Sequence, residues 1–118
     1  MQIQAASRLI ANWKDWNKKQ IHLVNSKNPA WAMDAYLLYV EDDPKGNHIF
    51  YGSTKSKHGS GHIMLVLDRK DNIVAFAMKD RDQLYRDAKQ IVEGTATYRH
   101  LRDWNVVKPG MKSVWTIQ

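Results

Sequence analysis

The sequence contains no cysteine among its 118 residues. Without thiols the chain can form no disulfide framework, no thiolate zinc site and no cysteine nucleophile, which excludes several enzyme classes. It also has no apolar run near the ~18 residues that a membrane-spanning helix needs. The stretch MQIQAASRLIANW lacks the continuous apolar segment and small-residue cleavage site of a secretory signal, so we interpret it as part of the fold. We therefore expect a cytoplasmic protein with no membrane partner.

Complete catalytic and phosphate-binding motifs are also missing. The segment YGSTKSKHGSGH, residues 51–62, is rich in glycine and lysine, but it lacks the terminal Gly-Lys-Ser/Thr of a P-loop and leads into a strand. No Gly-x-Ser-x-Gly element marks a serine nucleophile. His58 and His62 are four residues apart, but the glycines between them oppose a helical face and no acid is close in sequence. We therefore expect neither a metal nor a cofactor.

Positive charge is in excess and is unevenly distributed. The formal net charge is +6, from 18 basic and 12 acidic residues. Residues 44–67 contain three lysines and no acid, and residues 94–118 carry four basic groups against Asp103. A basic surface favours nucleic acid or an acidic protein surface as a partner, although it can also serve solubility alone.

Hydrophobic periodicity predicts the order helix, two hairpins, helix, strand. Apolar residues recur at helical spacing from Ile3 to Trp16, which indicates an N-terminal amphipathic helix of about 16 residues. Apolar and β-branched runs flank turn-forming residues in two stretches, 35–53 and 62–78, and each is typical of a hairpin. Asp80 with Gln83 resembles a capping pair, and the helical pattern after it stops at Gly94. Residues 112–117 form a last strand.

The sum of these elements is one α+β domain spanning residues 1–118. Its sheet is mainly antiparallel and consists of two consecutive hairpins and a C-terminal strand, with the N-terminal helix and a helix at about 81–93 packed on it. Both strands of the second hairpin are apolar on both faces, which is typical of covered, central strands. Five side chains there are expected to be largely buried: Ile63, Leu65, Leu67, Val74 and Phe76.

Two basic segments are candidate anion-binding sites. We expect residues 52–62 to form a loop between the hairpins, where Gly52, Gly59 and Gly61 allow backbone amides to turn toward an anion and Lys55, Lys57 and His58 add donors; a flexible connection is the alternative. Residues 97–105, TYRHLRDWN, combine phosphate-binding arginines with planar rings; packing of those rings on the core is the alternative. We expect the two segments to meet in one electropositive surface, with its contacts from Lys55, Lys57, His58, Arg99, Arg102 and Trp104.

These features favour a small basic binding protein without catalytic residues, whose partner is a polyanion and foremost a nucleic acid. An alternative is a protein-binding inhibitor or accessory factor of a larger, possibly nucleoprotein, machine, since charge also steers association with acidic proteins. A second alternative is a small metal-independent ribonuclease, in which His58, His62 and His100 would transfer protons and nearby cations would stabilise the reacting phosphate.

Overall fold

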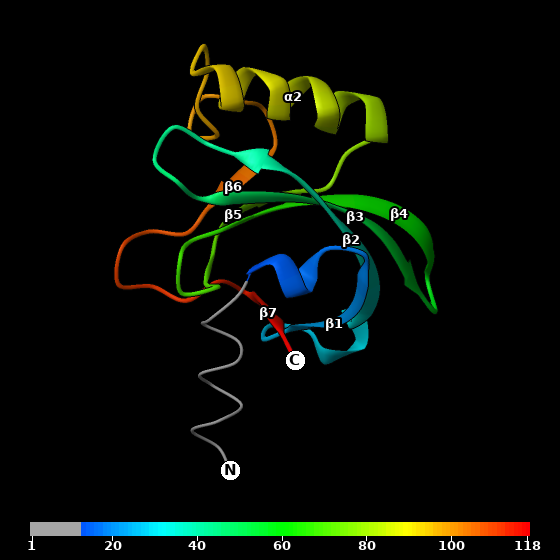
Figure 1. Cartoon of the computed structure of the whole chain (residues 1–118). Coiled ribbons are helices and arrows are strands. Elements are labelled where there is room, and N and C mark those ends of the chain that lie inside the picture. Colours follow the sequence, from blue (N-terminus) through cyan, green and yellow to red (C-terminus); the bar gives the residue numbers. More distant parts are fainter. Residues whose placement is uncertain (1–12) are drawn as a thin grey trace.

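Seven antiparallel strands form one sheet that curves into a half-barrel (Figure 1). The computed structural model describes residues 13–118, and every structural statement here refers to that part of the chain. The strand order across the sheet is β6-β5-β4-β3-β2-β1-β7. The strand bounds are β1 Lys19–Asn25, β2 Met33–Asp42, β3 His48–Ser56, β4 Gly59–Leu67, β5 Ile73–Ala77, β6 Trp104–Val106 and β7 Trp115–Ile117.

One α-helix, α2 (Arg81–Glu93), lies across one face of this sheet (Figure 1). The Asp80 side chain accepts a hydrogen bond from the Gln83 backbone N–H at 3.0 Å, and the helix ends at Gly94 in the left-handed conformation. The predicted second helix is therefore confirmed, with its caps. Two short 3-10 turns, η1 (Trp13–Trp16) and η2 (Pro29–Trp31), complete the described elements. No helix in residues 13–118 is long and apolar enough to span a membrane.

The two predicted hairpins are confirmed, and both turns are built in the same way. In the β2–β3 turn the Asp43 carboxylate accepts hydrogen bonds from two backbone N–H groups and from the side-chain amide of Asn47, four residues later. In the β4–β5 turn Asp68 and Asn72 repeat this arrangement. An aspartate that bonds the backbone of the following residues stabilises a turn locally, which explains why sequence patterns located both turns.

The sheet has a separate core on each face. Between the sheet and α2 lies a helix-side core: Ile49, Tyr51, Met64, Val66, Ala75, Ala77, Leu84, Ala88 and Ile91. The concave face carries an inner core: Ile21, Leu23, Met33, Ala35, Leu37, Phe50, Ile63, Leu65, Leu67, Ile73, Phe76 and Trp115. The expected burial of the second hairpin is confirmed for Ile63, Leu65, Leu67 and Phe76, whereas Val74 is only partly buried.

The predicted α+β class, with an N-terminal helix and two helices on the sheet, is wrong. The described chain is mostly antiparallel sheet with a single α-helix. Within the expected N-terminal helix, Trp13–Trp16 form a 3-10 turn, and residues 1–12 lie outside the described part. Lys18 then adopts a positive φ of 63°, which is incompatible with a continuing helix, and the chain enters β1. Pairing of β1 with β2 buries Ile21 and Leu23, a tertiary contact that sequence periodicity did not reveal.

The prediction of a loop at residues 52–62 is also wrong, because this segment is a third hairpin. β3 and β4 remain paired up to Ser56 and Gly59, so only Lys57 and His58 form the turn. Gly52 lies inside a strand, where an added Cβ would stand 2.9 Å from Cγ2 of Ile63 in the neighbouring strand. Glycine is needed at this position for close packing between strands, not for loop flexibility.

Candidate functional site

Part of the sheet's helix-side face is not covered by α2 and carries a group of tyrosines. Tyr36, Ser53 and His62 are direct cross-strand partners on β2, β3 and β4. Tyr51 lies two residues before Ser53 on β3, and Tyr85 of α2 packs on it with ring centroids 5.1 Å apart. We call these five residues the tyrosine face. Tyr36 is 43% exposed and Tyr85 39% exposed, so two aromatic rings are open to solvent.

A short hydrogen-bond chain fixes the polar atoms of the tyrosine face. Ser53 Oγ donates to the Tyr51 hydroxyl at 3.4 Å, and that hydroxyl lies 2.6 Å from Nδ1 of His62. The Tyr51 and His62 rings also stack, with centroids 5.9 Å apart. If the phenol donates to Nδ1, neutral His62 carries its proton on Nε2. His62 is only partly buried, so this N–H is a donor available to a bound ligand.

The helix adds cations to the tyrosine face. Arg81, Tyr85 and Lys89 are spaced four residues apart, so they lie on one flank of α2. Burial raises the pKa of the Tyr85 phenol, and Tyr51 raises it further, while the positive charge of Arg81 lowers it. Arg81 therefore lies close enough to Tyr85 to affect its pKa. This flank of α2 presents the Tyr85 ring between the positive charges of Arg81 and Lys89.

The β3–β4 hairpin supplies further positive charge beside the tyrosine face. Lys55 follows Ser53 on the same face of β3, and Lys57 and His58 form the turn. Asp34 lies opposite Lys55, but its carboxylate bonds Nδ1 of His22 at 2.9 Å. Among the described residues no ion pair involves Lys55, Lys57 or Lys89. None of these ammonium groups lies within 4.0 Å of a carboxylate oxygen in the described part of the chain, although Asp34 is the cross-strand partner of Lys55.

The structure does not bring the second basic segment to this site. Gly94, at the end of α2, lies near Pro44 in the β2–β3 turn. Burial raises the pKa of Tyr98, Asp43 of the same turn raises it further, and a hydrogen bond with Asn47 lowers it. Tyr98 therefore also lies close to this turn. Arg99 and Arg102 follow in this region, both exposed. The Lys57–His58 turn lies at the other end of the nine-residue strands β3 and β4 (Figure 1). The prediction that residues 52–62 and 97–105 meet in one electropositive surface is therefore wrong.

Trp104 belongs to a buried polar network. Its indole Nε1 donates to the Asp87 carboxylate at 2.9 Å, and its ring packs on Tyr98 with centroids 6.2 Å apart. Gln83 donates to the same carboxylate at 2.8 Å, and Lys79 forms an ion pair with it. Burial raises the pKa of Asp87, but the three hydrogen bonds and the charge of Lys79 outweigh burial and hold it below its ordinary value. This network anchors α2 to β6.

The three histidines of the ribonuclease hypothesis are separated. His58 lies in a turn, His62 lies four residues further along β4, and His100 lies in the segment after α2, where Nδ1 is 2.9 Å from the Thr97 hydroxyl. At about 3.3 Å per residue along a strand, His58 and His62 are roughly 13 Å apart. Within residues 13–118, no group of three or more His, Asp or Glu side chains is arranged to hold a metal ion.

Sequence reasoning found Lys55, Lys57, His58 and His62 but missed the tyrosines and Arg81. Alternation along β2 places Tyr36 and Leu38 on one face and Leu37 on the other, which is a usable signal. This alternation does not tell which part of a face the helix leaves open.

Comparisons with protein-family models, with curated proteins and with solved structures find no match to this chain. The function therefore has to be argued from the site itself.

Proposed function

We propose that this protein binds single-stranded nucleic acid through the tyrosine face and the adjacent β3–β4 hairpin. The observation that carries the proposal is the pairing of two exposed tyrosine rings, Tyr36 and Tyr85, with cations of the β3–β4 hairpin on one side and of α2 on the other. Aromatic rings stack on bases of any sequence, and lysine and arginine contact the phosphates between them. A cysteine-free binder of this kind fits the expected cytoplasmic location.

A single strand fits this surface better than a duplex. Bases can stack on protein rings only when they are unpaired and splayed out, whereas in a duplex the bases are covered by their neighbours. The tyrosine face lies on a sheet beneath the flank of α2, and neither element projects as a groove-reading helix. The donor on His62 Nε2 can contact a phosphate or a base edge. We infer contacts that do not depend on base sequence, because stacking on the two exposed tyrosine rings is open to any base.

The test is a titration of fluorescently labelled single- and double-stranded DNA and RNA at several salt concentrations, with binding read by anisotropy. The double variant Lys55→Glu, Lys57→Glu should bind all sequences more weakly. Its slope of log affinity against log salt should shrink by about 1.4, since each lost contact to a single strand contributes about 0.7. Tyr36→Ala should cost ~1–3 kcal/mol of binding, the range for loss of a stacked base. Tyr36→Phe should retain affinity because the ring remains.

Arg99 and Arg102 offer a matched control at the other end of the sheet. The double variant Arg99→Glu, Arg102→Glu changes the net charge as much as the hairpin variant does. Under the proposal it should change affinity far less and leave the salt slope intact. Equal loss from both charge reversals would show diffuse electrostatic attraction and would contradict a defined site. Unmeasurable binding by the unaltered protein near physiological salt would favour an acidic protein as the partner.

A further inference from the structure

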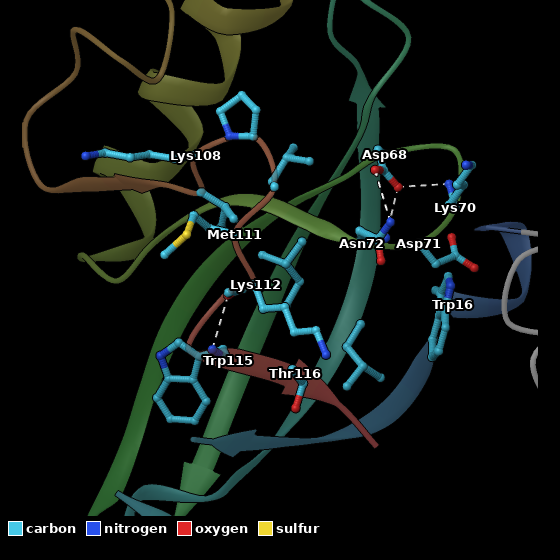
Figure 2. Close-up of a pocket in the computed structure, with 17 residues that line it drawn as sticks. Trp16, Asp68, Lys70, Asp71, Asn72, Lys108, Met111, Lys112, Trp115 and Thr116 are labelled. Carbon is cyan, nitrogen blue, oxygen red and sulfur yellow. Dashed lines mark hydrogen bonds between the residues drawn. The ribbon is translucent and has the colours of Figure 1, made fainter. Parts of the chain in front are cut away.

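A hollow of about 790 Å³ lies on the side of the molecule away from α2 (Figure 2). It is bounded by the β4–β5 turn, by residues 107–114, by β7 and by Trp16 of η1. The strands β6 and β7 are the two edges of the curved sheet, and the segment from 107 to 114 connects them across its open side. The hollow therefore lies at the open seam of the half-barrel, and its volume is within the ~300–1,000 Å³ usual for ligand pockets.

The floor of the hollow is apolar. Ile73 and Trp115 belong to the inner core but also line this space, and the partly buried side chains of Trp16 and Ile117 pack beside them. Met111, from the connecting segment, adds a flexible apolar side chain and is 67% exposed. Ile73 and Trp115 are each only 7% exposed, so a ligand on this floor would remove from water chiefly the surface of Trp16, Ile117 and Met111.

The walls of the hollow are rich in cations. Lys70, Lys108 and Lys112 line it, and in the part of the chain that the structure describes no ion pair involves any of the three. In Figure 2 the Lys112 side chain extends across the space. The Lys108 side chain extends away from the space, so Lys112 is the cation best placed to meet a ligand there (Figure 2).

Two carboxylates also line the hollow and offset part of this charge. Asp68 accepts three hydrogen bonds from its own turn, from Lys70 N, Asn72 N and Asn72 Nδ2. Asp71 lies beside Trp16, and burial raises the pKa of its carboxyl. A hydrogen bond between the Trp16 side chain and this carboxyl lowers its pKa, and the buried Oδ2 atom is left as a candidate acceptor for a polar hydrogen of a ligand. Three ammonium groups against two carboxylates leave a net charge of +1 around the hollow, which favours an anion.

We propose that this hollow binds a small anionic amphiphile, with its apolar body on Ile73, Trp16 and Trp115 and its carboxylate or sulfonate head on Lys112. The site is distinct from the tyrosine face, which lies on the opposite face of the sheet. An apolar floor with a few convergent polar groups is the usual composition of a small-molecule site. Because the charged side chains line the walls and the floor is apolar, the ligand that fits has a charged group at one end and an apolar body.

The experiment uses the full chain and three ligands with equal alkyl chains, kept below their micelle-forming concentrations: dodecanoate, dodecyltrimethylammonium and dodecanol. Binding is measured by calorimetry and by tryptophan fluorescence, because two tryptophans line the hollow. Dodecanoate should bind at least about tenfold more tightly than the cation, a ratio equal to 1.4 kcal/mol. Equal binding of the anion and the cation, or no saturable binding of dodecanoate, overturns the proposal.

Variants identify the site. Lys112→Ala should weaken dodecanoate binding about tenfold and leave dodecanol binding unchanged. Lys45→Ala, a matched change in the β2–β3 turn, should leave both unchanged. Ser113→Trp places a large ring in the hollow and should abolish binding of both ligands while the circular dichroism spectrum stays native. A single-stranded oligonucleotide should not displace dodecanoate. Dodecanoate binding that survives in Ser113→Trp, or that Lys45→Ala weakens as much as Lys112→Ala, places the ligand elsewhere and refutes the proposal.

Discussion

Replacement of Asp87 by alanine should destabilise the protein by ~3–5 kcal/mol, the usual cost of removing one partner from a buried ion pair. Asp87 is 2% exposed and the Lys79 side chain 11% exposed, so the ammonium group would be left in a poorly hydrated place without its counterion. The Trp104 indole N–H and the Gln83 amide would lose their acceptor as well. Because this network holds α2 on the sheet, it also fixes Tyr85 above Tyr51.

Urea unfolding followed by circular dichroism measures this cost. Asp82→Ala on the same helix is the matched control, because Asp82 has a 76% exposed side chain and should cost less than about 1 kcal/mol. The double variant Asp87→Leu, Lys79→Met should recover part of the loss, since it removes both charges. A cost below about 1 kcal/mol for Asp87→Ala, or equal costs for the two aspartates, would refute the reasoning.

The pH dependence of stability gives a second measurement at the same residue, with Asp87→Asn as the variant. The folded pKa of Asp87 is lowered, so its contribution to the free energy of unfolding is complete above the unfolded value of about 3.9. The contribution is lost as the pH falls through the folded pKa. The stability difference between the unaltered protein and Asp87→Asn should therefore be constant near neutral pH and shrink in acid. A stability difference that grows as the pH falls would contradict the lowered pKa of Asp87.

Three further predictions concern the core and one phenol. Leu65→Ala should cost ~2–5 kcal/mol in urea unfolding, because Leu65 is fully buried in a central strand, and a cost under about 1 kcal/mol would contradict that burial. Gly52→Ala should cost ~1–3 kcal/mol, because the added methyl would stand 2.9 Å from an Ile63 side-chain carbon; an unchanged urea midpoint would show that the strands can separate without cost. Burial, a hydrogen bond to Asp42 and the charges of Asp42 and Glu41 together raise the pKa of Tyr39 to about 12. Alkaline absorbance titration should therefore show one phenol ionising near pH 12, and its stabilising effect should be lost as the pH rises from about 10 through 12.

Local chemistry explains which elements could be predicted. The turns at Asp43 and Asp68 and the helix from Asp80 to Gly94 are specified by side chains that bond the backbone only a few residues away. Such interactions form within a short segment, so they leave a pattern in the sequence. The burial of Leu65 follows in the same way from a run that is apolar on both faces.

The tertiary structure alone decided the fold class and the arrangement of the candidate site. Glycines and lysines at 52–62 resemble a loop, yet β3 and β4 pair through this segment because Gly52 lets the packed strands approach closely. Lys55 falls on the same face as Tyr36 only through strand register, and Tyr85 reaches that face only through the position of α2. The segment after α2, which contains Arg102 and has similar local chemistry, lies near the β2–β3 turn at the other end of these strands. Composition determined that the surface is basic, whereas contacts between residues distant in sequence decided which cations share a face with aromatic rings.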